Sequence, residues 1–150
     1  MRNSRLFPFL FLLVLASAMT QACGSPMSSV APNCGTAPTA ANSGVPATIS
    51  VCPATADAKD YPNGQVQFVA TGYFAAPPSP VSPLKVEIWG ACQQQSSTTE
   101  VSITSTGLAQ CDPGASGTYN VFASDGTNCN VISACGGGCQ VSGQAQLTCP

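Results

Sequence analysis

The residues of this sequence best equipped for chemistry are its cysteines. The chain has nine cysteines and no histidine. In an exported protein, cysteines meet an oxidising environment in which they normally pair as disulfides. Because nine is an odd number, one sulfur requires a different role. The nine are Cys23, Cys34, Cys52, Cys92, Cys111, Cys129, Cys135, Cys139 and Cys149.

The N-terminal residues predict export. Arg2 and Arg5 precede an apolar run over residues 6–15, and small residues follow at positions 16–18. This order is typical of a secretory signal peptide. The apolar run is also too short to cross a bilayer, which needs roughly twenty residues. We therefore expect residues 1–22 to be a signal peptide.

Cys23 is the candidate for the odd cysteine. It follows the small residue Ala22, in the place where bacterial lipoproteins carry a lipid-modified cysteine. Lipidation of Cys23 would anchor the protein in the membrane of the cell envelope and leave eight cysteines for up to four disulfides. Gln21 and Thr20 depart from the usual lipoprotein signal. That departure leaves open an uncleaved anchor, or cleavage after Ala18 and release of a soluble protein.

Groups suited to catalysis are sparse. The absence of histidine removes the commonest general base and a common metal ligand. The acidic residues are scattered near turns and form no pair by spacing. Residues 135–139 hold two cysteines separated by three glycines with no basic neighbour, which favours a structural role over a redox one. We expect no enzyme, no cofactor and no metal site.

The charge pattern argues against nucleic acid as a partner. After the signal, only Lys59 and Lys85 oppose six acidic residues, a net charge of −4. Such a surface lacks the basic footprint that nucleic acid requires. The expected partners are the membrane, through the lipid on Cys23, and an unknown protein or glycan. Trp89, the single tryptophan, is expected to pack in the core rather than to serve as a platform for sugars.

The remaining sequence divides into a tether and one domain. Residues 23–47 are rich in Ser, Pro, Ala, Thr and Gly, which predicts a flexible tether. A disulfide at Cys34 would hold part of that tether to the domain. From residue 48 onward, short alternating runs separated by turn residues predict an all-β sandwich or barrel. The expected strands are residues 48–51, 65–74, 84–89, 100–104, 118–124 and 144–149, and a further short strand is expected to end at Cys111.

Disulfide pairing among the eight cysteines of residues 34–150 follows from strand positions only as a first hypothesis. Eight cysteines allow 105 connectivities, so several pairings stay open. A Cys/Gly-rich loop is expected near residues 129–143. The favoured pairs are Cys92 with Cys111, Cys52 with Cys149, and Cys129 with Cys135 or Cys139.

The order of short motifs over residues 48–124 resembles bacterial immunoglobulin-like domains of the second group. The motifs are residues 48–53 (TISVCP), residues 63–72 (NGQVQFVATG), the isolated Trp89, Gly107-Leu108, and the run from Asp112-Pro113-Gly114 to Val121. The resemblance implies an immunoglobulin-like β-sandwich of about seven short strands with a binding, adhesive or structural role. Disulfides are unusual in that family. The alternative is a freely secreted, disulfide-rich module that binds carbohydrate or protein, or acts as an inhibitor.

Overall fold

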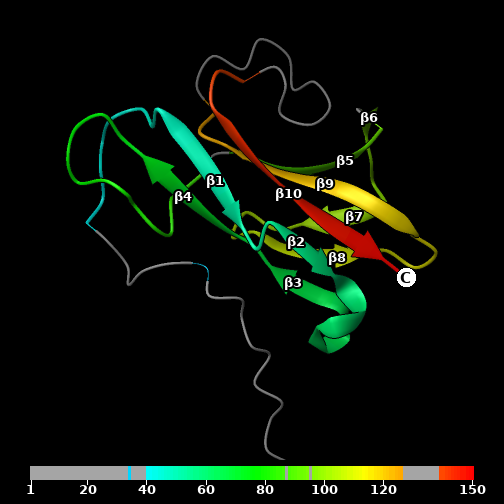
Figure 1. The fold of residues 1–150 in the computed structure, drawn as a ribbon. Coiled ribbons are helices and arrows are strands. Elements are labelled where there is room, and N and C mark those ends of the chain that lie inside the picture. Colours follow the sequence, from blue (N-terminus) through cyan, green and yellow to red (C-terminus); the bar gives the residue numbers. More distant parts are fainter. Residues whose placement is uncertain (1–33, 35–39, 87, 95, 127–138) are drawn as a thin grey trace, which may run out of the picture.

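A computed structural model describes residue 34 and residues 40–86, 88–94, 96–126 and 139–150 (Figure 1). These residues are mostly β-structure; they contain no α-helix and two short 3-10 helices, η1 (Ala58–Asp60) and η2 (Pro62–Gly64). The ten strands of this part are β1 (Thr48–Cys52), β2 (Thr55–Asp57), β3 (Gln65–Gln67), β4 (Val69–Tyr73), β5 (Ile88–Gln93), β6 (Ser96–Ser97), β7 (Val101–Ile103), β8 (Leu108–Cys111), β9 (Gly117–Ser124) and β10 (Ser142–Cys149).

The strands form three sheets. The largest has the order β2-β10-β9-β5-β6, a second has the order β3-β8-β7, and β1 pairs with β4 alone. Within the largest sheet, β10 pairs antiparallel with β9 along its whole length, from Ser142 opposite Ser124 to Cys149 opposite Gly117. On its other edge β10 pairs with β2, and this pairing is parallel.

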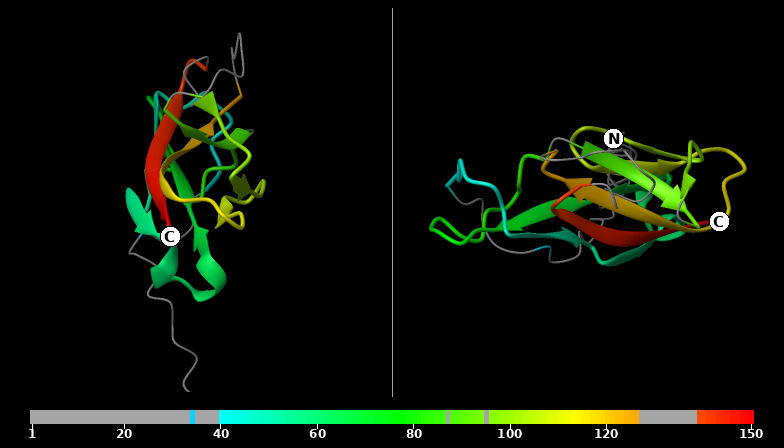
Figure 2. Two further views of the ribbon diagram at one scale, coloured as in Figure 1. Left: turned by 90° about the vertical axis from the view of Figure 1, so that its right-hand side faces the viewer. Right: turned by 90° about the horizontal axis from the view of Figure 1, so that it is seen from above.

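Alternating burial explains how the strands build the core. In β10, Gly143, Ala145, Leu147 and Cys149 are buried, while the residues between them are not. This period of two is that of a strand with one face against the core. Strands of the two larger sheets lie on different sides of the molecule in Figures 1 and 2. Their buried side chains meet in one cluster that includes Val66, Phe68, Ala91, Val101, Ala109, Tyr119, Val121 and Leu147.

The chain changes sheets at Phe68. One strand was expected over residues 65–74, but the structure divides it into β3, which pairs with β8, and β4, which pairs with β1. Phe68 is fully buried between them, and its N–H donates to the carbonyl oxygen of Gly107 at 2.9 Å. The alternating pattern of the sequence continues without a break through this segment. The point at which the strand divides is therefore decided by the strands available for pairing, β8 and β1.

The strand expected at residues 84–89 is displaced toward the C-terminus and appears as β5. Residues 81–86 run instead along the edge of β4 that β1 leaves open: Val81 bridges Gly72, and the N–H of Leu84 donates to the carbonyl oxygen of Ala70 at 2.8 Å. Pairing with β9 therefore begins only at Ile88, opposite Ser124.

The other expected strands are confirmed as β1, β7, β9 and β10, with ends shifted by one or two residues. Strands β2 and β6 were not expected, because segments of two or three residues are too short to show an alternating pattern. A strand that ends at Cys111 was expected and is present as β8. The expected loop at residues 129–143 ends earlier than predicted, since residues 142 and 143 belong to β10. Residues 127–138 lie outside the described part.

Candidate functional site

Two disulfides join segments that are distant in the sequence. Cys34 bonds to Cys52 at the end of β1, and Cys111 of β8 bonds to Cys149 of β10. The second bond links the two larger sheets, with Cα atoms 5.9 Å apart, within the usual range for disulfides. The expected pairings of Cys92 with Cys111 and of Cys52 with Cys149 are therefore wrong. The paired cysteines are brought together by the packing of the sheets and not by their proximity in the sequence.

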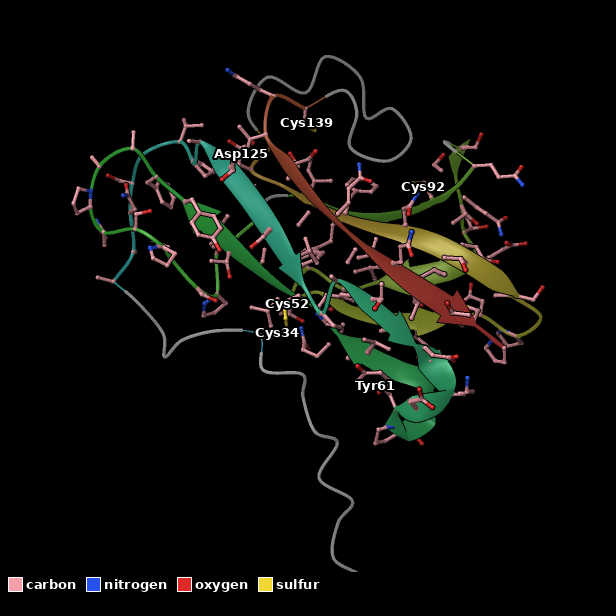
Figure 3. The ribbon with its side chains drawn as sticks, viewed as in Figure 1. Cys34, Cys52, Tyr61, Cys92, Asp125 and Cys139 are labelled. Carbon is pink, nitrogen blue, oxygen red and sulfur yellow. A yellow bond between two sulfur atoms is a disulfide. The ribbon has the colours of Figure 1, made fainter. Side chains whose placement is uncertain are left out.

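Two more of the described cysteines are oxidised. Cys92 and Cys139 are both disulfide-bonded, and Figure 3 shows them in the upper part of the view, away from Cys34 and Cys52 near its middle. Cys23, Cys129 and Cys135 lie outside the described residues, so lipidation of Cys23 and the pairing of Cys129 stay predictions. All six cysteines in the described part of the chain are thus bonded, and an odd sulfur must be one of the other three.

The segment ahead of β1 is attached to the domain. Beyond the disulfide at Cys34, the side-chain amide of Asn42 donates to the carbonyl oxygens of Ala76 and Pro78, both at 3.0 Å. The N–H of Ala47 donates to the carbonyl oxygen of Tyr73 at 2.7 Å. These contacts attach Asn42 to the loop that follows β4 and Ala47 to the last residue of β4.

Trp89 lines a pocket at the point where β3 and β4 separate. The pocket has a volume of about 410 Å³. Its floor consists of the buried side chains of Phe68, Ala70 and Val86, and Leu84 and Trp89 are partly buried at its wall. Trp89 was expected in the core; the structure packs one part of it against the core cluster and turns another part toward this pocket.

The turn between β7 and β8 sets the position of the Trp89 ring. Gly107 in this turn has a φ of +83°. A Cβ atom at Gly107 would lie 2.5 Å from the carbonyl oxygen of Phe68 and 2.9 Å from the ring atom Cζ2 of Trp89. Only glycine fits this position. The side-chain amide of Gln67 holds the turn from the other side, donating to the carbonyl oxygens of Phe68 at 2.8 Å and of Thr106 at 2.7 Å.

A second hollow, of about 550 Å³, is lined by η1, η2 and the turn between β8 and β9. Its one basic residue, Lys59, forms an ion pair with Asp57, and the N–H of Lys59 also donates to the Oδ1 atom of Asp57. The hydrogen bond from Lys59 lowers the pKa of the Asp57 carboxyl, and the same bond raises the pKa of Lys59. Asp57 therefore serves local structure at the start of η1.

A buried tyrosine anchors the start of β9. The hydroxyl of Tyr119 donates to the Oε2 atom of Glu100 at 2.7 Å and lies 3.1 Å from the carbonyl oxygen of Ser116. The hydrogen bond to Glu100 raises the pKa of Tyr119, and desolvation acts in the same direction. Through this hydrogen bond Glu100, which directly precedes β7, is linked to β9.

The described residues contain no group of three or more His, Cys, Asp or Glu side chains that could hold a metal ion. Nor does this part of the chain contain a helix long and apolar enough to cross a membrane. Asp125, the last acidic residue, lies beyond the end of β9 (Figure 3).

Comparison with known proteins assigns no family: no family model matches the chain, and no curated protein matches it either. The immunoglobulin-like resemblance therefore depends on the order of the motifs and strands of this chain.

Proposed function

We propose that this chain is a non-catalytic lipoprotein of the bacterial cell envelope that presents an immunoglobulin-like β-sandwich for binding, adhesion or a structural role. The observation that carries the proposal is the order of the strands within the sheets.

The order of the strands supports an immunoglobulin-like arrangement. In that fold one sheet has the order A-B-E-D, and the other has the order G-F-C, with C′ next to C in variable-type domains. Here β1 pairs with β4, which continues from β3, and β3 pairs with β8, which pairs with β7. The other sheet has the order β2-β10-β9-β5-β6, in which β10-β9-β5-β6 corresponds to G-F-C-C′ and β2 is an additional edge strand. If β3 and β4 count as one divided strand B, both orders agree.

Two side chains support the proposed correspondence. Immunoglobulin domains carry a tyrosine near the start of strand F whose hydroxyl bonds to the backbone a few residues upstream. Tyr119 near the start of β9, with its hydroxyl next to Ser116, corresponds to it. Trp89 on β5 corresponds to the tryptophan of strand C. The disulfide between Cys111 and Cys149 differs from the usual one, since it joins the counterparts of strands E and G.

The absence of catalysis is inferred from the residues that remain for it. The chain has no histidine. Among the described acidic residues, Asp57 is paired with Lys59, and Glu100 accepts a hydrogen bond from buried Tyr119. A general acid or base works best when its pKa lies near neutral pH, and the hydrogen bond from Lys59 lowers the pKa of Asp57 instead.

The proposed anchor at Cys23 is supported by the count of cysteines and by the attachment of Cys34. Six described cysteines are bonded, so Cys23 is one of three candidates for the odd sulfur. The disulfide between Cys34 and Cys52 would shorten the spacer between Cys23 and the domain to the ten residues 24–33. Fully extended, these span at most about 40 Å, which would keep the domain close to the membrane surface.

The proposal is tested by intact mass on protein from a bacterial envelope fraction, alkylated without reductant. A chain that begins at Cys23, carries acyl groups and takes up no alkylating reagent is the expected result. The matched control is Cys23→Ser, which should appear in the soluble fraction without acyl groups. A wild-type mass that begins at Met19 with one alkylated thiol would overturn the anchor.

That second outcome would favour a freely secreted, disulfide-rich binding module. The observation in favour of this alternative is the pair Thr20 and Gln21, which departs from the usual lipoprotein signal.

A further inference from the structure

The pocket next to Trp89 has the dimensions and lining of a site for a small ligand. Its volume of about 410 Å³ lies within the range of about 300–1,000 Å³ for ligand pockets, which are mostly apolar with a few polar groups. The floor is buried and apolar, and the exposed residues Gln67, Lys85 and Thr106 stand at the rim. A ligand that fits would bury an apolar body and leave a polar end at the surface.

Two polar side chains at the rim, those of Gln67 and Thr106, already have partners within the protein. The amide nitrogen of Gln67 donates to two backbone carbonyl oxygens. The hydroxyl of Thr106 lies 2.9 Å from that of Thr104. Recognition of a sugar needs several hydrogen-bonding groups around the aromatic ring. Because these groups hold the turn between β7 and β8 in place, the pocket favours an apolar ligand over a glycan.

Lys85 supplies the charge of the site. It is the only charged side chain among the described residues that line the pocket, and it is exposed. Lys59, the other lysine, pairs with Asp57 beside a different hollow. A cation at the rim of an apolar pocket attracts a ligand whose polar end is an anion.

We propose that this pocket binds a small amphipathic carboxylate, with its acyl or aryl body against Trp89 and Leu84 and its carboxylate near Lys85. The inference names a ligand class and so rests on the proposed binding role, but it does not depend on the lipid anchor. Binding involves no covalent step.

Trp89 makes the test direct, because it is the only tryptophan of the chain and lines the pocket. The full chain carrying Cys23→Ser, exported and oxidised, would need no detergent that competes for the site. Hexanoate, octanoate and decanoate, each below its micellar concentration, are titrated while the emission of Trp89 is recorded. We expect saturable blue shifts, with a Kd that falls about fourfold for each added methylene.

Two lysine variants and an uncharged ligand test the role of charge. Decanoate should bind up to about fivefold more tightly than decan-1-ol, the range expected for an exposed ion pair. Lys85→Gln should abolish this preference, whereas Lys59→Gln should keep it. Equal preferences in Lys85→Gln and in the parent chain would overturn the assignment of the carboxylate to Lys85.

The pocket itself would be rejected if decanoate left the Trp89 emission unchanged, or if affinity did not depend on chain length. A response to a β-linked glucose tetrasaccharide, without one to decanoate, would overturn the proposal in favour of a glycan platform. These outcomes are distinct from failure of the anchor, which the intact mass of wild-type protein reports.

Discussion

The close approach of Phe68, Gly107 and Trp89 leads to a sharp prediction for Gly107→Ala. At a φ of +83°, an alanine costs about 1–2 kcal/mol in backbone strain. Its Cβ would also lie 2.5 Å from the carbonyl oxygen of Phe68, a backbone atom that cannot turn away as a side chain can. Overpacking of this kind costs about 1–3 kcal/mol more. The free energy of unfolding should therefore fall by about 2–5 kcal/mol.

The matched control is Gly114→Ala in the turn between β8 and β9. Gly114 has a φ of +92°, and a Cβ there would meet no atom within 4 Å. This variant carries the backbone strain alone, so it should lose only about 1–2 kcal/mol. The difference between the two variants isolates the crowding at Gly107.

Urea unfolding without reductant, followed by circular dichroism, measures both variants. Circular dichroism is preferred because a change at Gly107 would also alter the emission of Trp89 in the folded state. We expect a lower midpoint for Gly107→Ala than for Gly114→Ala, at an unchanged slope with urea. Equal losses in the two variants would refute the close packing of the β7–β8 turn against Phe68.

Two further predictions concern the core. Hydrogen bonding to Glu100 raises the pKa of Tyr119 above the unfolded-state value of about 10. The hydrogen bond from the Tyr119 hydroxyl therefore contributes its full stability below that unfolded-state pKa. The contribution is lost as pH rises through the higher folded-state pKa. Urea midpoints between pH 8 and pH 11.5 should fall less steeply in Tyr119→Phe, and identical slopes would contradict this assignment. Replacing both Cys111 and Cys149 with Ser should lower the free energy of unfolding by about 4 kcal/mol, because the disulfide closes a loop with a sequence separation of 38. An unchanged urea midpoint would contradict this prediction.

Strands with long alternating patterns could be predicted from the sequence. In β10 the alternation of small or apolar with polar residues persists over the strand, so both its existence and its buried face followed from local composition. The strands β2 and β6 could not be found in this way. They form because β10 and β5 offer them backbone hydrogen-bonding groups, which the sequence of β2 or β6 does not reveal.

The pocket could be anticipated only in part. Trp89 was an evident candidate for ligand contact by residue type, but its half-buried position depends on Gly107, eighteen residues later in the chain. Lys85 was expected in a strand with Trp89. Its place at a pocket rim arises because residues 81–86 bond to the edge of β4 instead of β9.

The sequence alone determined the β-rich class, the oxidised cysteines and the lack of histidine chemistry, because these depend on composition and on patterns within a few residues. The tertiary structure decided which cysteines pair, where the strand at Phe68 divides, and which side chains surround Trp89. Each of those depends on backbone groups and side chains that meet across sheets from distant parts of the chain. Local propensity does not encode such long-range contacts. They are selected only when all the strands pack together around one core.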